Sequence, residues 1–121
     1  MTSFRYVVLF VKDINVSRAF YTELLGVGPK ELSPTFLSYE LESGIGVELW
    51  QLDRVHPASS TTGGGSELCM ILPDADSLNR LYDEWKGKGV KFATSPTKAV
   101  FGLTFVALDP DGHRLRANSQ S

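Results

Sequence analysis

The sequence predicts an α+β fold made of two copies of one unit, and three observations support this. An apolar run that ends in an aspartate occurs twice, at residues 6–13 and 67–74, with an offset of 61 residues. Apolar residues at helical spacing and then strand-like segments follow each run. A Gly- and Ser-rich stretch separates the copies. Two such copies would create a cleft between them.

The first unit begins with residues 4–11, which are rich in Val, Phe, Tyr and Leu and are typical of a β-strand. Both of its faces are apolar, so we expect a central strand. Asp13 is placed to cap the following helix, and Gly26 to end it. The predicted apolar stripe of this helix consists of Val16, Ala19, Phe20 and Leu24.

Two or three strands are expected from Val27 to Trp50. Residues 36–41 alternate, Ser43-Gly44 is typical of a turn, and residues 45–52 return as a strand. Because side chains alternate along a strand, Gly46, Glu48 and Trp50 would share one face.

Residues 53–66 are predicted to be a flexible linker, because they hold Ser, Thr and a run of three glycines but little that could form a core. A phosphate-binding loop is disfavoured, because no Lys-Ser or Lys-Thr follows the glycines.

The second unit repeats the plan. Residues 67–72 form a strand, Asp74 or Asp76 caps a helix, and Gly87 or Gly89 ends that helix. The predicted helix stripe consists of Leu78, Leu81, Tyr82 and Trp85. Strands are expected at residues 90–94, at 99–108 with a bend at Gly102, and at 113–117, the last after a turn at 109–112.

Composition limits the class of protein. A chain of 121 residues suits a single domain, 1–121, with units at about 4–52 and 67–118. The net charge of −2 argues against a nucleic-acid partner. The sequence contains no apolar run of the roughly 20 residues that a membrane span needs. One cysteine excludes an intrachain disulfide framework, and the first residues lack signal-peptide features, so we expect a cytoplasmic protein.

Several short segments, in order, carry a family resemblance: residues 10–13, 17–21, 25–26, 47–50, 87–90 and 109–112. Together they resemble the vicinal oxygen chelate superfamily, which includes glyoxalase I, extradiol dioxygenases and bleomycin-resistance proteins. The resemblance implies two βαβββ units that form a curled mixed sheet around a cleft, and a homodimer. It does not imply one reaction, because the superfamily hosts several.

In metal-using relatives each unit supplies two metal ligands, and the resemblance places these positions at Tyr6, Glu48, Glu67 and Arg116. The side chains present argue against a metal. Arg116 has only donors and stays protonated, and Tyr6 is a poor ligand at neutral pH. At an effective dielectric constant of 20, two unit charges about 4 Å apart repel by about 4 kcal/mol. We therefore expect no cofactor, with a divalent metal as the alternative.

The remaining candidate ligands do not restore the site. His113 follows the turn at 109–112 and His56 lies in the linker, so both are expected to be solvated. Cys69 shares the strand face of Glu67. A buried core thiol is the favoured role, and a thiol that faces the cleft is the alternative.

We interpret the cleft centre as an ion pair in which Glu48 and Glu67 flank Arg116. Its role is either purely structural, because buried charges need partners, or it holds a polar group of a ligand. Trp50 and Phe36 would supply aromatic surface for a planar molecule, although core packing would equally explain Trp50.

The favoured function is a metal-independent small-molecule-binding protein of the bleomycin-resistance type, which sequesters a planar organic molecule or antibiotic. The set of ligand-binding residues is Tyr6, Phe36, Glu48, Trp50, Glu67, Cys69 and Arg116. One alternative is a metal-dependent glyoxalase-like lyase or isomerase, or a dioxygenase, that uses Glu48 and Glu67. Another is metal-free acid–base catalysis with a glutamate as base and Tyr6 as acid. Whether the protein is an enzyme stays open.

Overall fold

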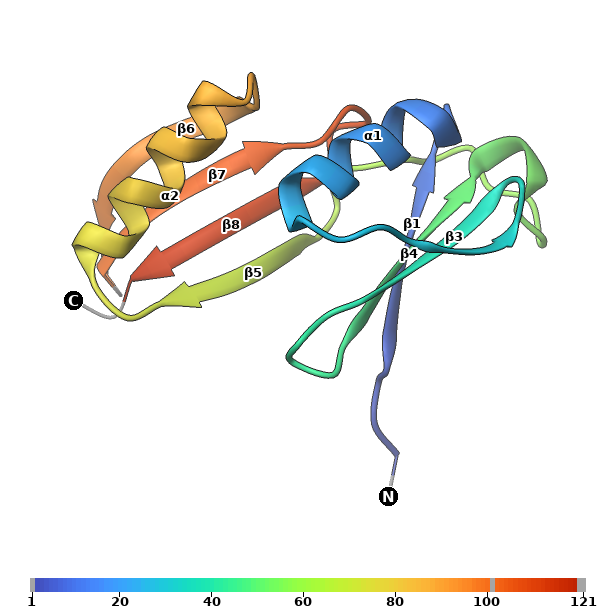
Figure 1. The fold of residues 1–121 in the computed structure, drawn as a ribbon, viewed down its shortest axis with the longest axis horizontal. Coiled ribbons are helices and arrows are strands. Elements are labelled where there is room, and N and C mark those ends of the chain that lie inside the picture. The colour runs from blue at the N-terminus through green and yellow to red at the C-terminus, as the bar shows by residue number, and fades with distance from the viewer. Residues whose placement is uncertain (1, 101, 120–121) are drawn as a thin grey trace. The chain divides into compact units, whose positions relative to one another are not determined.

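The computed structural model describes residues 2–100 and 102–119. The chain divides into two compact units, Met1–Gly63 and Gly64–Ser121. Each consists of one four-stranded mixed sheet and one α-helix. Figure 1 shows the ribbon with α1 and α2 labelled. Among the described residues, neither helix is long and apolar enough to cross a membrane. That the two units share one domain stays a prediction.

Unit 1 has the order strand, helix and three further strands. These elements are β1 (Tyr6–Val11), α1 (Ile14–Leu25), β2 (Lys30–Ser33), β3 (Phe36–Glu40) and β4 (Gly46–Gln51), followed by a short 3₁₀ helix at Leu52–Arg54. The strand order in the sheet is β1-β4-β3-β2. β1 pairs with β4 in parallel, and the other pairs are antiparallel.

Unit 2 repeats this topology. Its elements are β5 (Glu67–Leu72), α2 (Ala75–Gly87), β6 (Lys91–Ala99), β7 (Gly102–Leu108) and β8 (Arg114–Ser119). The strand order is β5-β8-β7-β6, with β5 and β8 parallel. The predicted α+β fold of two βαβββ units with mixed sheets is confirmed.

Both helices begin as the sequence predicts. The Asp13 carboxylate accepts hydrogen bonds from the backbone N–H groups of Asn15, at 3.0 Å, and Val16, at 3.3 Å. Asp74, rather than Asp76, caps α2 and accepts from the backbone N–H of Ser77 at 2.7 Å. These carboxylates satisfy backbone donors that the first helical turn leaves free.

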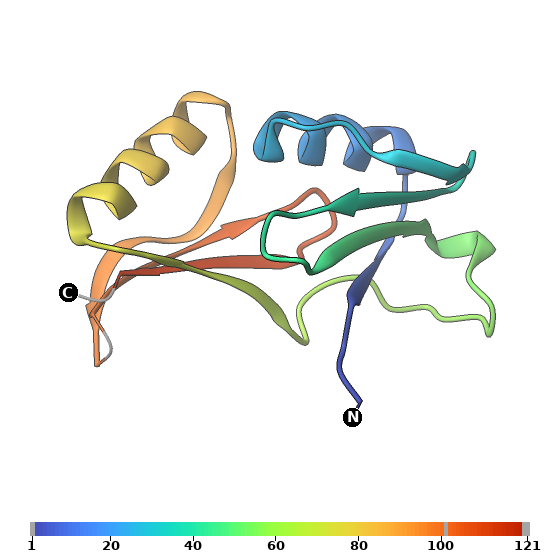
Figure 2. The same cartoon turned by 60° about the horizontal axis from the view of Figure 1, so that its bottom comes forward.

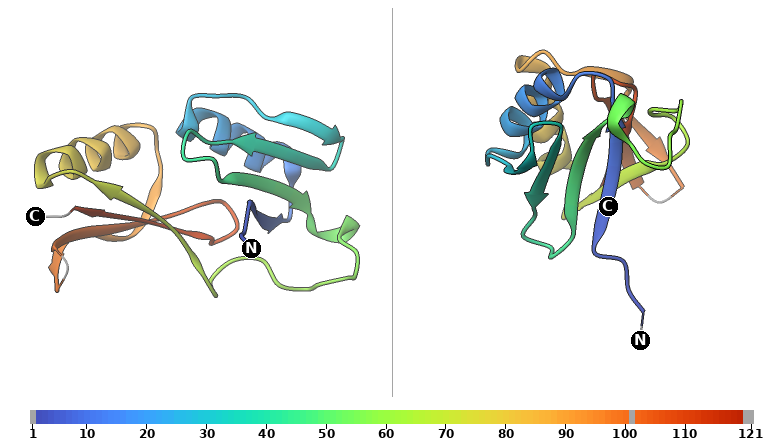
Figure 3. Two further views of the ribbon diagram at one scale, coloured as in Figure 1. Left: turned by 90° about the horizontal axis from the view of Figure 1, so that it is seen from below. Right: turned by 90° about the vertical axis from the view of Figure 1, so that its right-hand side faces the viewer.

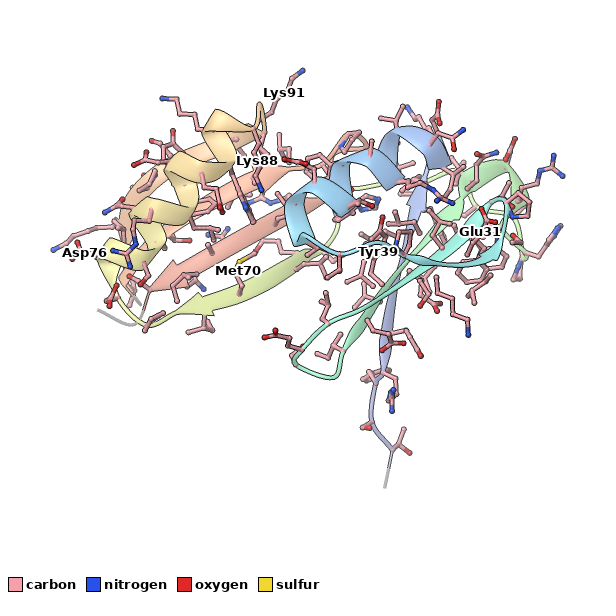
Figure 4. The ribbon with its side chains drawn as sticks, in the orientation of Figure 1. Glu31, Tyr39, Met70, Asp76, Lys88 and Lys91 are labelled. Atoms are coloured by element: carbon pink, nitrogen blue, oxygen red, sulfur yellow. The ribbon has the colours of Figure 1, made fainter. Side chains whose placement is uncertain are left out.

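Each helix covers one face of the sheet of its own unit and leaves the other face without a helix from that unit (Figures 2 and 3). In unit 1 the covered face carries Leu37, Val47 and Leu49, all buried. Tyr39 on β3 points toward α1 (Figure 4), where its hydroxyl lies 2.9 Å from Thr22 Oγ1 and donates to the Arg18 carbonyl at 3.2 Å. We call the uncovered face of each sheet its open face.

The predicted stripe on α1 is wrong. The buried residues of this helix are Ile14, Ser17 and Tyr21, whereas Val16 is 50% exposed. α1 carries apolar side chains on more than one side, so spacing alone did not identify the packed face. The small side chain of Ser17, fully buried, lets the helix approach the sheet closely.

β1 is an edge strand, which corrects the prediction of a central one. Leu9 and Val11 are buried, but Tyr6, Val7 and Val8 are each about 40% exposed. Apolar residues on both faces of a strand indicate that both faces of the sheet are packed against other groups at that strand. They do not indicate whether the strand lies at the edge or in the centre of the sheet. The prediction confused these two properties.

In unit 2 the strand bounds and one histidine differ from expectation. β6 runs on to Ala99, and Gly102 opens β7 with φ of 125° instead of bending a longer strand. The turn at 109–112 is confirmed: Asp109 Oδ1 accepts from the backbone N–H of Asp111, at 2.9 Å, and of His113, at 2.8 Å. The predicted surface position of His113 is wrong, because the residue is only 7% exposed.

The first residues of the predicted linker, 53–66, are ordered within unit 1 rather than irregular. Residues 53 and 54 belong to the 3₁₀ helix, and Val55 is 4% exposed. The flexibility of the remaining Gly- and Ser-rich part stays a prediction.

Candidate functional site

The open face of unit 1 carries a row of three aromatic side chains. Phe10 on β1, Trp50 on β4 and Phe36 on β3 are cross-strand neighbours. The Phe36 and Trp50 rings are stacked, with centroids 4.8 Å apart and planes 4° from parallel. All three are partly exposed. The parallel planes show that Phe36 and Trp50 stack on each other, and the exposed parts of the three rings offer aromatic contact area to a ligand.

A second row lies at the other end of the same strands. Tyr6 on β1 pairs with Gly46 on β4, which pairs with Glu40 on β3. The Tyr6 hydroxyl donates to Glu40 Oε1 at 3.2 Å. The Tyr6 ring lies over Gly46, where an added Cβ would come within 2.5 Å of it. Glycine at position 46 therefore allows the tyrosine ring to lie flat on the sheet.

Glu48 lies between these rows, paired with Val8 on β1 and Ser38 on β3. It is partly exposed, and it has no hydrogen bond or ion pair among the residues that the structure describes. The structure thus brings four of the predicted site residues onto one face: Tyr6, Phe36, Glu48 and Trp50.

The open face of unit 2 carries a polar network centred on Glu67. Arg116 donates from Nε to Glu67 Oε1 at 2.7 Å and from Nη2 to Oε2 at 2.9 Å. Arg114 donates from Nε to Oε2 at 2.8 Å. One carboxylate on β5 is therefore shared by two guanidinium groups on β8. The hydrogen bond from Arg116, followed by that from Arg114, lowers the pKa of Glu67 below its ordinary value.

The network continues across the sheet. Arg116 Nη1 donates to Thr104 Oγ1 at 3.1 Å, and the Thr104 hydroxyl donates to Asn118 Oδ1 at 2.7 Å. The Asn118 amide in turn donates to Cys69 Sγ at 3.3 Å. Cys69 is exposed, so the favoured prediction of a buried core thiol is wrong. The alternative holds in part: the thiol lies on the open face, beside Arg116 in register.

The predicted ion pair is present in part. Glu67 flanks Arg116, but the side chains are 28% and 24% exposed, so the pair is not fully buried. The flanking role of Glu48 belongs to the other unit and stays a prediction. Sequence reasoning missed Arg114. Two features of the sequence could have identified it. Residues 114, 116 and 118 are every second residue of one strand, so their side chains share a face. In the repeat, Arg114 is the counterpart of Gly46: it pairs with Glu67 as Gly46 pairs with Tyr6.

The donor chemistry of unit 2 does not fit a divalent metal. Both oxygens of Glu67 accept hydrogen bonds from arginines, and a cation bound there would face two fixed positive charges. Within residues 2–100 and 102–119, no three His, Cys, Asp or Glu side chains gather in a way that would hold a metal ion. We therefore derive no chemistry through a metal.

The fold agrees with the comparison to protein families. The model of the Glyoxalase/Bleomycin resistance protein/Dioxygenase superfamily matches residues 3–117. The chain belongs to this superfamily, which confirms the resemblance read from the sequence.

Individual relatives are similar over most of the chain. The phenazine antibiotic resistance protein EhpR of Enterobacter agglomerans is 25% identical over 112 residues, which span 90% of this chain and 85% of EhpR. A protein of Agrobacterium tumefaciens solved by solution NMR is 40% identical, with a TM-score of 0.89 and coverage of 100% of this chain and 99% of that one. A glyoxalase-related enzyme from Fulvimarina pelagi is 19% identical, with a TM-score of 0.84 and coverage of 98% and 88%. This last likeness shows the fold alone.

Proposed function

We propose that this protein binds a planar aromatic molecule without a metal and acts by sequestering it, in the manner of a resistance protein. The observation that carries the proposal is the stacked Phe36–Trp50 pair on the open face of unit 1. Aromatic rings on a sheet face that no helix of the unit covers offer a ligand partly exposed aromatic contact area.

The relative EhpR supports the class of ligand. Its name records resistance to phenazine antibiotics. A phenazine is a flat, fused three-ring system, and the row of Phe10, Trp50 and Phe36 presents aromatic surface across three strands. Phenazines are therefore the first ligands to test on this chain.

A few placed polar groups give orientation and specificity in most ligand sites, and each open face carries such groups. On unit 1 these are Tyr6 and Glu48, and on unit 2 they are Glu67, Cys69 and Arg116. On unit 2, Arg116 is the residue we expect to contact a polar group of a ligand at that face, because it is a fixed donor held in place by Glu67.

The test is a tryptophan fluorescence titration with phenazines. The chain has two tryptophans, and Trp85 is 3% exposed on the covered side of unit 2. We expect ligand to quench the wild-type emission and to leave the emission of Trp50→Phe, which comes from Trp85 alone, nearly unchanged. Equal quenching in both proteins would overturn the proposed platform.

One observation favours a second candidate, metal-free acid–base catalysis. Glu48 is a partly exposed carboxylate with no described partner on the face that carries Tyr6 and Trp50. A carboxylate so placed is available to accept a proton from a bound molecule. The catalyst and the binder differ in outcome: a catalyst converts its ligand and loses turnover in Glu48→Gln, whereas the binder releases the ligand unchanged.

Three further expectations belong to this proposal. The chain forms a homodimer, it acts in the cytoplasm, and its partner is a small organic molecule rather than nucleic acid or a membrane. The exposed apolar residues Phe4, Val7 and Ile45 of unit 1 support the first of these, because contact with a second chain would remove them from water.

A further inference from the structure

We propose that Arg114 and Arg116 form an anion-binding site on the open face of unit 2, and that the ligand of this protein carries a carboxylate or a similar anionic group. Glu67 is the positioning residue of that site. The inference rests on the proposed function and adds to it the charge of the ligand and the role of Arg114.

The first argument is charge balance. Two guanidinium groups share one carboxylate, so the cluster of Glu67, Arg114 and Arg116 has a net charge of about +1. The next side chains on this face are Cys69 and the Asn118 amide. No described acidic side chain other than Glu67 forms an ion pair with either arginine. A bound anion would balance the remaining positive charge of this cluster.

The second argument is the supply of free donors. Arg114 donates to Glu67 from Nε alone, and its Nη1 and Nη2 groups have no hydrogen bond or ion pair among the described residues. Its side chain is 38% exposed, so these donors are open to solvent and to a ligand. A guanidinium with two free terminal nitrogens matches the two oxygens of a carboxylate.

The third argument is preorganisation. Arg116 is held at three nitrogens, two on Glu67 and one on Thr104, and Thr104 is fixed by Asn118. Glu67 also orients Arg114 through Oε2. A ligand anion would therefore meet two positioned cations and would not have to order long side chains on binding.

Stability alone is a weak explanation for the arrangement. Partly exposed ion pairs contribute little to folding, and a second arginine on an already paired carboxylate adds repulsion between the two cations. An anion bound between or beside the two guanidinium groups would offset that repulsion, which gives the arrangement a role in binding.

The test compares two probes that differ in one anionic group: neutral phenazine and phenazine-1-carboxylate. Isothermal titration calorimetry measures both affinities without relying on tryptophan emission. The variant is Arg114→Gln, and the matched control is Arg80→Gln, which makes the same charge change on the exposed side of α2.

We expect the wild-type protein to bind phenazine-1-carboxylate more tightly than neutral phenazine. Arg114→Gln should weaken the carboxylate about tenfold or more and leave neutral phenazine unchanged. Arg80→Gln should change neither.

The outcomes separate the two proposals. Equal wild-type affinity for both probes, or equal losses in Arg114→Gln and Arg80→Gln, would overturn the anion site and leave the binding function standing. No binding of either probe would overturn the proposed function, and the anion site with it. If Arg114→Gln folds poorly, the salt dependence of binding to the wild-type protein tests the anion site. Raising NaCl from about 50 to about 500 mM should weaken the binding of phenazine-1-carboxylate and leave that of neutral phenazine unchanged. Equal salt dependence would contradict the site.

Discussion

Arg116 and Glu67 are joined by a two-pronged ion pair, with Nε 2.7 Å from Oε1 and Nη2 2.9 Å from Oε2. Arg116 stands on β8 where its repeat counterpart on β4 is Glu48: each pairs in register with the third residue of its parallel partner strand. The two units thus place opposite charges at equivalent positions. One fold position has become a carboxylate in one copy and a carboxylate-binding cation in the other.

The stability that Glu67 contributes should depend on pH. The arginines lower the pKa of Glu67 in the folded protein. Its contribution to the unfolding free energy is therefore present at pH values above its unfolded-state pKa, near 4.3, and is lost as the pH falls through its lower folded-state pKa. We expect Glu67→Gln to cost roughly 0.5–1 kcal/mol of unfolding free energy at pH 7. The cost should be smaller at about pH 3 than at pH 7, measured by urea denaturation at both pH values.

Glu42 provides the control for this measurement. It is exposed in the β3–β4 loop and has no ion pair among the described residues. Glu42→Gln should therefore change the unfolding free energy little, and equally at both pH values. A Glu67→Gln cost that stays constant from pH 7 to about pH 3 would contradict the ion-pair account.

Gly46 should tolerate a methyl group only when Tyr6 is absent. An added Cβ would lie 2.5 Å from the Tyr6 ring, so Gly46→Ala must displace that ring and its hydrogen bond to Glu40. We expect a cost of about 1–2 kcal/mol in wild type. In a Tyr6→Ala background the cost should largely disappear, as measured by a double-mutant cycle on unfolding free energies.

Gly28 is the matched control, because nothing lies within 4 Å of the Cβ that alanine would add there. Gly28→Ala should change stability by no more than about 0.5 kcal/mol in either background. Equal costs for Gly46→Ala with and without Tyr6 would show that the ring does not lie over the glycine.

The purified protein should sediment as a dimer of the 13.3 kDa chain. Phe4 is 95% exposed just before the edge strand β1, and burying such a side chain is worth about 2 kcal/mol. We therefore expect Phe4→Ser to shift the equilibrium toward monomer in sedimentation equilibrium. Val27→Ser, at a loop residue that is 48% exposed, should not shift it. A wild-type monomer at micromolar concentration would contradict the prediction.

Local chemistry in the sequence predicted local structure well. Asp13 and Asp74 cap helices because a carboxylate needs only the backbone N–H groups two or three residues ahead, so the motif carries its own partner. The shared face of Gly46, Glu48 and Trp50 followed from alternation along a single strand. The internal repeat then predicted that the second unit would copy the order of helix and strands of the first.

Features that depend on distant partners were harder to predict. Arg114 follows a turn and reads as an ordinary surface residue, because its partner Glu67 is 47 positions away and meets it only through the β5–β8 register. His113 was expected to be solvated for the same reason, yet the residue is buried and its backbone N–H donates to Asp109 Oδ1. The buried side of α1 was missed because the packing partner, not the helix, selects the face.

The central claim is that this chain binds a planar aromatic ligand without metal and without changing it. The most direct measurement is calorimetric titration of phenazine-1-carboxylate into chelator-dialysed protein, repeated after addition of nickel, zinc, manganese or iron, with the ligand recovered and analysed by mass. The account predicts the same affinity under every condition and an unaltered ligand. Binding that requires one of the metals, or a ligand recovered with a changed mass, would contradict it.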